Sequence, residues 1–121
     1  MRHVIFATTA LSLTCCAAFA GSDPAADFKK ADAALNATFK QIERRLSDDT
    51  GGRARFVKAQ RAWIAFRDAE CTFQSSGDDG GSAAPMVATA CKATVTTQRT
   101  KQLKAYLNCQ EGDLACPVPT E

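Results

Sequence analysis

The feature that most constrains the fold of this chain is a set of four cysteines, Cys71, Cys91, Cys109 and Cys116. Their spacing contains no CxxC pair, which favours disulfides over a metal or redox site. Four cysteines allow three pairings, and we favour Cys71–Cys91 with Cys109–Cys116 because each bond joins neighbours in the sequence. A bond that closes a loop of roughly 20 residues stabilises a fold by about 3 kcal/mol. The sequence therefore predicts a small domain held by covalent staples.

The first 20 residues have the composition of a secretory signal peptide. A basic start, Arg2 and His3, precedes an apolar run, and the letters AFA before residue 21 form a small-x-small cleavage pattern. We therefore expect a periplasmic or secreted protein that begins at residue 21, in a compartment where disulfides persist. Lipid anchoring through Cys16 is the alternative, but the residues before Cys16 fit a lipoprotein signal poorly.

Composition excludes several classes of function. His3 is the only histidine, so a chain cleaved after residue 20 lacks the imidazole that Ser-His-Asp, Cys-His and histidine–zinc chemistry need. Arg2 is the only one of the 15 lysines and arginines in that segment, which leaves 14 against 13 acidic residues and no basic footprint for nucleic acid. No later apolar stretch is long enough to span a bilayer. Because phosphate-cradling and dinucleotide motifs are absent too, we predict a non-enzymatic protein without cofactor or metal.

Apolar spacing predicts three amphipathic helices. The first is expected to start at Pro24, capped by Asp23, and to bury one stripe: Phe28, Ala31, Leu35, Phe39, Ile42 and Leu46. The second should run from about residue 53 to 73 with two neighbouring stripes, which would make it the central helix: Phe56, Ala59, Trp63, Phe66 and Phe73, and Val57, Ile64 and Cys71.

The third helix is expected to begin near Ser82 as its cap, with Pro85 in the first turn, and to end near residue 107. Its first turns should be buried through Met86, Val87, Ala90 and Cys91. The stretch 94–100 is rich in threonine and locally prefers strand, but the helical spacing on both sides favours helix.

Together these helices predict an all-α fold, a small three-helix disulfide-stapled antiparallel bundle over residues 21–108. A Cys71–Cys91 bond requires Cα atoms about 5–6 Å apart, which would hold the second and third helices together as a hairpin. Residues 109–121 are expected to form an irregular tail pinned by Cys109–Cys116.

The densest cluster of polar and aromatic residues lies in the second helix. Trp63 is interpreted as a core anchor rather than a ligand-stacking platform, because it shares a stripe with Phe56 and Phe66. Arg67 and Asp68 are interpreted as structural, with Arg67 pairing with Glu70 on the helix surface. Two alternatives remain: a functional polar cluster, or a partly buried Arg67 bonded to the loop after the second helix.

Four segments resemble a known family: DFKKADAALNATFKQI at 27–42, AQRAWIAFRDAEC at 59–71, GGSAAPMVATAC at 80–91 and TTQRTKQLKAYL at 96–107. In this order they resemble the N-terminal domain of LprI-type lysozyme inhibitors. The resemblance implies an exported helical domain with a Cys71–Cys91 bridge that binds and blocks lysozyme.

The predicted function is therefore inhibition of lysozyme-type muramidases by a protein–protein contact. The alternative is a structural or interaction module of the envelope that binds another periplasmic protein. Neither the partner nor the oligomeric state follows from the sequence. The candidate contact residues lie in the exposed breaks between the helices: Arg53, Arg55, Ser75, Ser76, Asp78, Asp79 and Ser82.

Overall fold

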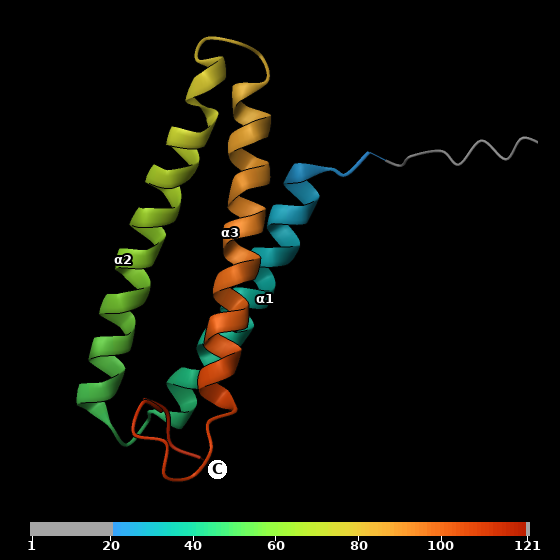
Figure 1. The fold of residues 1–121 in the computed structure, drawn as a ribbon. Coiled ribbons are helices and arrows are strands. Elements are labelled where there is room, and N and C mark those ends of the chain that lie inside the picture. The colour runs from blue at the N-terminus through green and yellow to red at the C-terminus, as the bar shows by residue number, and fades with distance from the viewer. Residues whose placement is uncertain (1–20, 121) are drawn as a thin grey trace, which may run out of the picture.

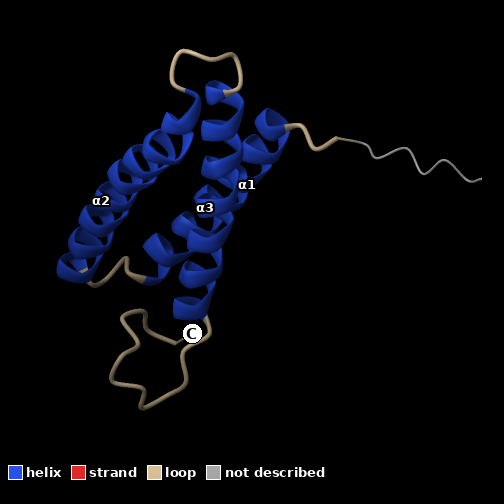
Figure 2. Cartoon of the chain, turned by 45° about the horizontal axis from the view of Figure 1, so that its top comes forward, coloured by secondary structure: helices blue, strands red, loops and turns tan. Residues whose placement is uncertain are grey.

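The structure, a computed structural model, describes residues 21–120 as three helices in an up-down-up arrangement (Figure 1). Helix α1 spans Pro24–Arg45, α2 spans Thr50–Ser75 and α3 spans Ala84–Leu107, with a short 3-10 helix, η1, at Ser76–Asp78. These residues contain no strand, so the predicted all-α antiparallel bundle is confirmed (Figure 2). The expected signal peptide and Cys16 lie outside the described residues.

Aspartate side chains cap the first two helices. Asp23 accepts a hydrogen bond from the Ala25 amide at 3.0 Å, and Asp49 accepts one from the Gly52 amide at 2.7 Å. Because Asp49 is the cap, α2 begins at Thr50, three residues earlier than expected. The prediction of Ser82 as the cap of α3 was wrong, since Ala83 holds that position without a side-chain cap.

The prediction that α2 is the central helix was also wrong. The backbone of α3 packs closely along α1 and also against α2, whereas α1 and α2 lie further apart and meet through side chains. Figure 1 shows α2 meeting α3 at the hairpin end and diverging from α3 toward its start. The buried residues of α2 are mostly polar: Gln60, Arg67, Cys71 and Ser75.

The two apolar stripes predicted for α2 are therefore largely exposed. Phe66 and Phe73 are 57% and 73% exposed, and Ile64 is 40% exposed. The reason is the disulfide: Cys71 must face α3, and Phe66 and Phe73 lie roughly 150° around the helix from it. The expected burial of the first turns of α3 was also wrong for three residues. Met86, Val87 and Ala90 are all exposed.

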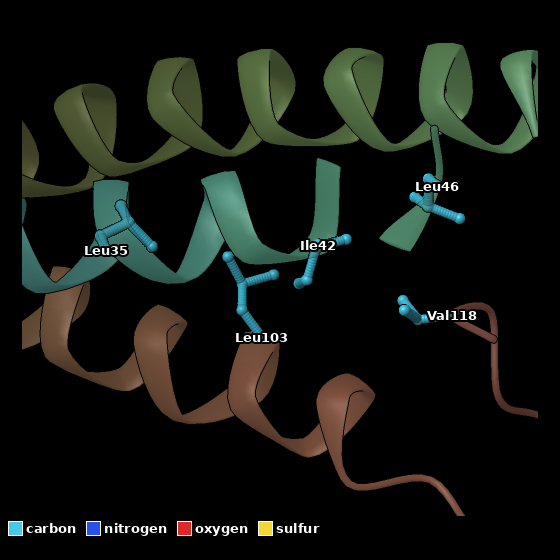
Figure 3. Packing of buried hydrophobic residues seen from close by; sticks show 5 residues of the cluster. All are labelled: Leu35, Ile42, Leu46, Leu103 and Val118. Carbon is cyan, nitrogen blue, oxygen red and sulfur yellow. The ribbon is translucent and has the colours of Figure 1, made fainter. Parts of the chain in front are cut away.

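The apolar core lies at the end of the bundle opposite the hairpin (Figure 3). It is formed by buried side chains from α1, α3 and the tail: Leu35, Ile42, Leu46, Leu103 and Val118. Phe56 of α2 reaches this cluster and stacks on Phe39, with ring centroids 4.8 Å apart. Val118 comes from the tail, so the last residues of the chain complete the core.

The threonine-rich stretch of α3 is helical, as predicted. Thr96 and Thr100 are buried, and the Thr100 hydroxyl donates to the Thr96 carbonyl at 3.1 Å. Such bonds to the preceding turn let a threonine face the interior of a helical bundle. Small side chains here also let α3 approach α1 closely.

Both disulfides join the pairs favoured from the sequence. Cys71 and Cys91 connect α2 to α3 with Cα atoms 5.5 Å apart, and Cys109 and Cys116 close the tail at 5.6 Å. No helix among residues 21–120 combines the length and apolar character that crossing a bilayer requires.

Candidate binding site at the hairpin tip

The most distinctive exposed structure is the connection between α2 and α3, residues 76–83, which we call the tip. The Cys71–Cys91 bond lies at its base and fixes the two helices that it joins. The tip begins with η1 and continues through an irregular turn to the start of α3 (Figure 1). A covalent clamp under a short loop limits the conformational entropy that the loop can lose on binding.

Hydrogen bonds within the tip centre on Asp78. Its side chain accepts from the Ala83 amide at 3.0 Å, and its carbonyl accepts from the Gly81 amide at 2.8 Å. This carboxylate bonds the amide of Ala83, the residue that precedes the first turn of α3, and so ties the tip to the start of that helix. Gly80 has a φ of +81°, and a Cβ on Gly81 would overlap the Asp78 carboxylate. The exposed break predicted between the second and third helices is therefore a turn ordered by its own hydrogen bonds.

The structure separates the predicted contact residues of this region into two kinds. Ser75 is buried and its hydroxyl donates to the Thr72 carbonyl, while the Ser76 hydroxyl donates to the Phe73 carbonyl at 2.7 Å. These hydroxyls are engaged by their own helix. Asp79 and Ser82 are exposed and have no such internal bond, and the exposed apolar residues Phe73 and Met86 flank the tip on the two helices.

Arg53 and Arg55 are not part of the tip, since they lie at the opposite end of α2. The 22 residues between Arg53 and Ser75 correspond to about 33 Å of helix. Arg53 forms an ion pair with Glu43 of α1 at 3.2 Å. One small contact surface therefore cannot include both the arginines and the tip.

A second polar cluster is buried between the helices and is centred on Arg67. Its guanidinium lies between two rings, 5.3 Å from the centroid of Phe28 and 5.4 Å from that of Trp63. Nη2 and Nε of Arg67 donate to one oxygen of Asp68 at 2.9 and 3.0 Å, and Asp32 of α1 lies 3.9 Å away.

The predicted surface pair between Arg67 and Glu70 was wrong. Glu70 instead accepts a hydrogen bond from Gln74, and Arg67 is only 9% exposed. Within residues 21–120 the partners of Arg67 are aromatic rings and aspartates rather than the loop after α2. Arg67 faces the interior because it lies one helical turn from Cys71, which fixes that face of α2 toward α3.

The positive charges around Asp68 affect the pKa of its carboxyl more strongly than its partial burial does. Burial alone would raise the pKa of this carboxyl, but the hydrogen bond and positive charge of Arg67, with Lys92 at 3.6 Å, hold the pKa below its usual value. The cluster thus joins α1, α2 and α3 through Asp32, Arg67 and Lys92.

Trp63 packs against the apolar core and also has a second arginine over its ring, Arg99 at 5.8 Å. Arg99 donates to Gln60 at 3.1 Å, and its burial lowers the pKa of the guanidinium, an effect that Tyr106 opposes. Neither Gln60 nor Arg99 was predicted from the sequence as a member of this cluster. Gln60 precedes Arg67 by seven residues, two helical turns, and this spacing is the signal that it shares the inward face.

The chemistry that the described residues offer is that of a binding surface. The buried arginine and glutamine side chains, Arg67 and Gln60, are occupied by partners within the bundle. The exposed tip presents a carboxylate and a hydroxyl beside two apolar side chains. These groups can bind a partner by charge, hydrogen bonds and apolar contact.

Comparison with known proteins identifies the family. The sequence matches the family described as "Lysozyme inhibitor LprI" over residues 7–103. It is 34% identical over 97 residues to an uncharacterized protein of Rhizobium meliloti (strain 1021), covering 71% of this chain and 70% of that protein. No solved structure matches the chain. The chain therefore belongs to the LprI lysozyme inhibitor family.

Proposed function

We propose that this protein is exported and inhibits a lysozyme-type muramidase by binding it without catalysis. The observation that carries the proposal is the match to the lysozyme inhibitor family across residues 7–103. Two disulfides fit an oxidising compartment outside the cytosol. The buried side chains of Arg67 and Gln60 bond to partners within the bundle, so the proposed contact uses the surface of the domain.

The tip is the part of the surface that we assign to lysozyme contact. It is exposed, held by the Cys71–Cys91 bond and ordered by its own hydrogen bonds, so little freedom is lost when it binds. Its aspartates, Asp78 and Asp79, give this end a local negative charge that complements a basic enzyme, although the net charge of the whole protein gives no long-range steering. Phe73 and Met86 would supply apolar contact beside them.

The proposal is tested by the rate at which lysozyme clears a suspension of bacterial cell walls. The oxidised protein at micromolar concentration is expected to slow lysis by at least one of three enzymes, of the hen, invertebrate and phage types. Unchanged lysis by all three would refute inhibition. Capture of an envelope protein in the same preparation would then favour an interaction module.

The tip is tested separately by reversing one exposed charge. Asp79→Lys is expected to weaken inhibition roughly fivefold, which corresponds to about 1 kcal/mol of binding energy. Asp48→Lys is the matched control, because Asp48 is also an exposed aspartate but lies in the turn between α1 and α2 at the other end. Equal inhibition by both variants would place the contact elsewhere while leaving the inhibition itself intact.

A further inference from the structure

One face of α2 carries apolar side chains that no other part of residues 21–120 covers. Ala59, Ala62, Phe66, Ala69 and Phe73 are all exposed, and we call them the α2 seam. Their spacing of three, four, three and four residues is the heptad spacing by which one helix packs along another. Exposed aromatic residues in a continuous apolar row mark an interaction surface.

The order of residues in the seam favours a second copy of the same chain as the occupant. From Ala62 to Phe73 small and large side chains alternate, because an alanine precedes each of the two phenylalanines. If two copies of α2 run antiparallel with Phe66 facing Ala69 of the second copy, the same register brings Ala62 opposite Phe73. Each phenylalanine then fits over an alanine, as knobs fit holes in a coiled coil. In a dimer with two-fold symmetry, the same surface of each copy forms the contact, so the seam of one copy covers the seam of the other.

Charge at the two ends of α2 supports the antiparallel direction. Arg55 and Lys58 are exposed near the start of the helix, and neither forms an ion pair within the described part of the chain. Asp78 and Asp79 lie in the tip at the other end. The register that matches the phenylalanines with alanines brings Arg55 and Lys58 within about one helical turn of the aspartates of the second copy. A parallel pairing would place like charges together.

We propose that two copies of this protein associate through the α2 seam in antiparallel orientation, with Phe66 and Phe73 of each copy packed on alanines of the other. The proposal does not rest on lysozyme binding, but it uses Phe73 and Asp79, which are also assigned to the lysozyme contact, so the two contacts exclude each other. The seam is about 21 Å long, which is short for a protein interface. The association is therefore weak, with a dissociation constant on the order of tens of micromolar.

Sedimentation equilibrium of the full oxidised protein between about 1 and 500 µM tests the association. The apparent mass is expected to double over this range and to stay monomeric in Phe73→Glu, with unchanged helical circular dichroism. Leu114→Glu is the matched control, because Leu114 is a fully exposed apolar residue of the tail that is not part of the seam, and it should leave the dimer intact. A wild-type protein that stays monomeric throughout, or a Phe73→Glu protein that still dimerises, would overturn the proposal.

Charge reversal tests the direction of packing with variants that leave the apolar seam intact. Arg55→Glu alone and Asp79→Lys alone are each expected to weaken dimerisation about three- to tenfold. The double variant, which restores opposite charges across an antiparallel contact, should recover most of the loss. A double variant at least as weak as the sum of the single variants would overturn the antiparallel arrangement.

Discussion

The two ends of this molecule are stabilised by different interactions. At the end away from the hairpin, apolar side chains from α1, α3 and the tail exclude water together (Figure 3). Toward the hairpin, the helices are joined by a disulfide and by the Arg67 cluster, and little apolar surface is buried. The difference shows how a domain of about 100 residues keeps one end exposed: a covalent bond and ion pairs replace the core there.

Breaking the apolar end should have the largest effect on stability. Leu103→Ala removes a fully buried side chain from the core, and we expect a loss of about 2–5 kcal/mol in the free energy of unfolding. Urea denaturation of the oxidised protein measures this loss. Leu114→Ala changes the same residue type at a fully exposed position and should alter stability by less than about 0.5 kcal/mol. Similar losses from the two variants would contradict the position of the core.

Removing the two disulfides one at a time compares how much each covalent bond contributes to the stability of its end of the molecule. The pair Cys71→Ala with Cys91→Ala opens a link of 20 residues and should cost about 3 kcal/mol. Replacing Cys109 and Cys116 opens a link of only 7 residues and should cost less, about 2.5 kcal/mol in the same loop-entropy estimate. Thermal and urea unfolding of both pairs give the comparison. A larger loss of stability from removing Cys109–Cys116 would contradict this order and show that the tail depends more on its disulfide than the hairpin end does.

The Arg67 cluster is expected to contribute less to the free energy of unfolding than the apolar core does. Arg67→Ala removes a cation between two rings and leaves Asp68 without its main partner, with an expected loss of about 1–3 kcal/mol. Arg61→Ala, an exposed arginine on the same helix, is the control and should be nearly neutral. If Arg67→Ala were as neutral as its control, the hairpin end would be held by the disulfide alone.

The pH dependence of Asp68 is the smallest expected effect. Its pKa in the folded protein lies below the usual 3.8, so its contribution is complete above pH 4 and declines as the pH falls through the folded-state value. Asp68→Asn should therefore cost under about 1 kcal/mol at pH 7, because the side chain is half exposed to solvent. The difference from wild type should shrink as the pH falls below the usual value and through the lowered folded-state pKa of Asp68. If the stability difference between Asp68→Asn and wild type grew as the pH fell, the pKa of Asp68 in the folded protein would be raised and not lowered.

The sequence was informative where one interaction determines the structure. Regular apolar spacing was enough to predict α1, and neighbouring cysteines were enough to predict the disulfides. It was misleading for α2, because Phe66 and Phe73 have the spacing of a buried stripe while the disulfide turns the polar face inward. Val118 could not be predicted as core, since an irregular tail has no periodicity that indicates which residue points inward. The tip residues were found by composition, but their internal hydrogen bonds were not.

Hydrogen exchange of the oxidised protein, with and without an inhibited lysozyme, tests most directly whether the clamped end forms the contact and the apolar end only supports it. We predict slower exchange of the amides of residues 76–83 in the complex, with no change in the half of α3 that contains Leu103. Protection confined to that half of α3, or none at the tip while lysozyme is bound, would contradict this division.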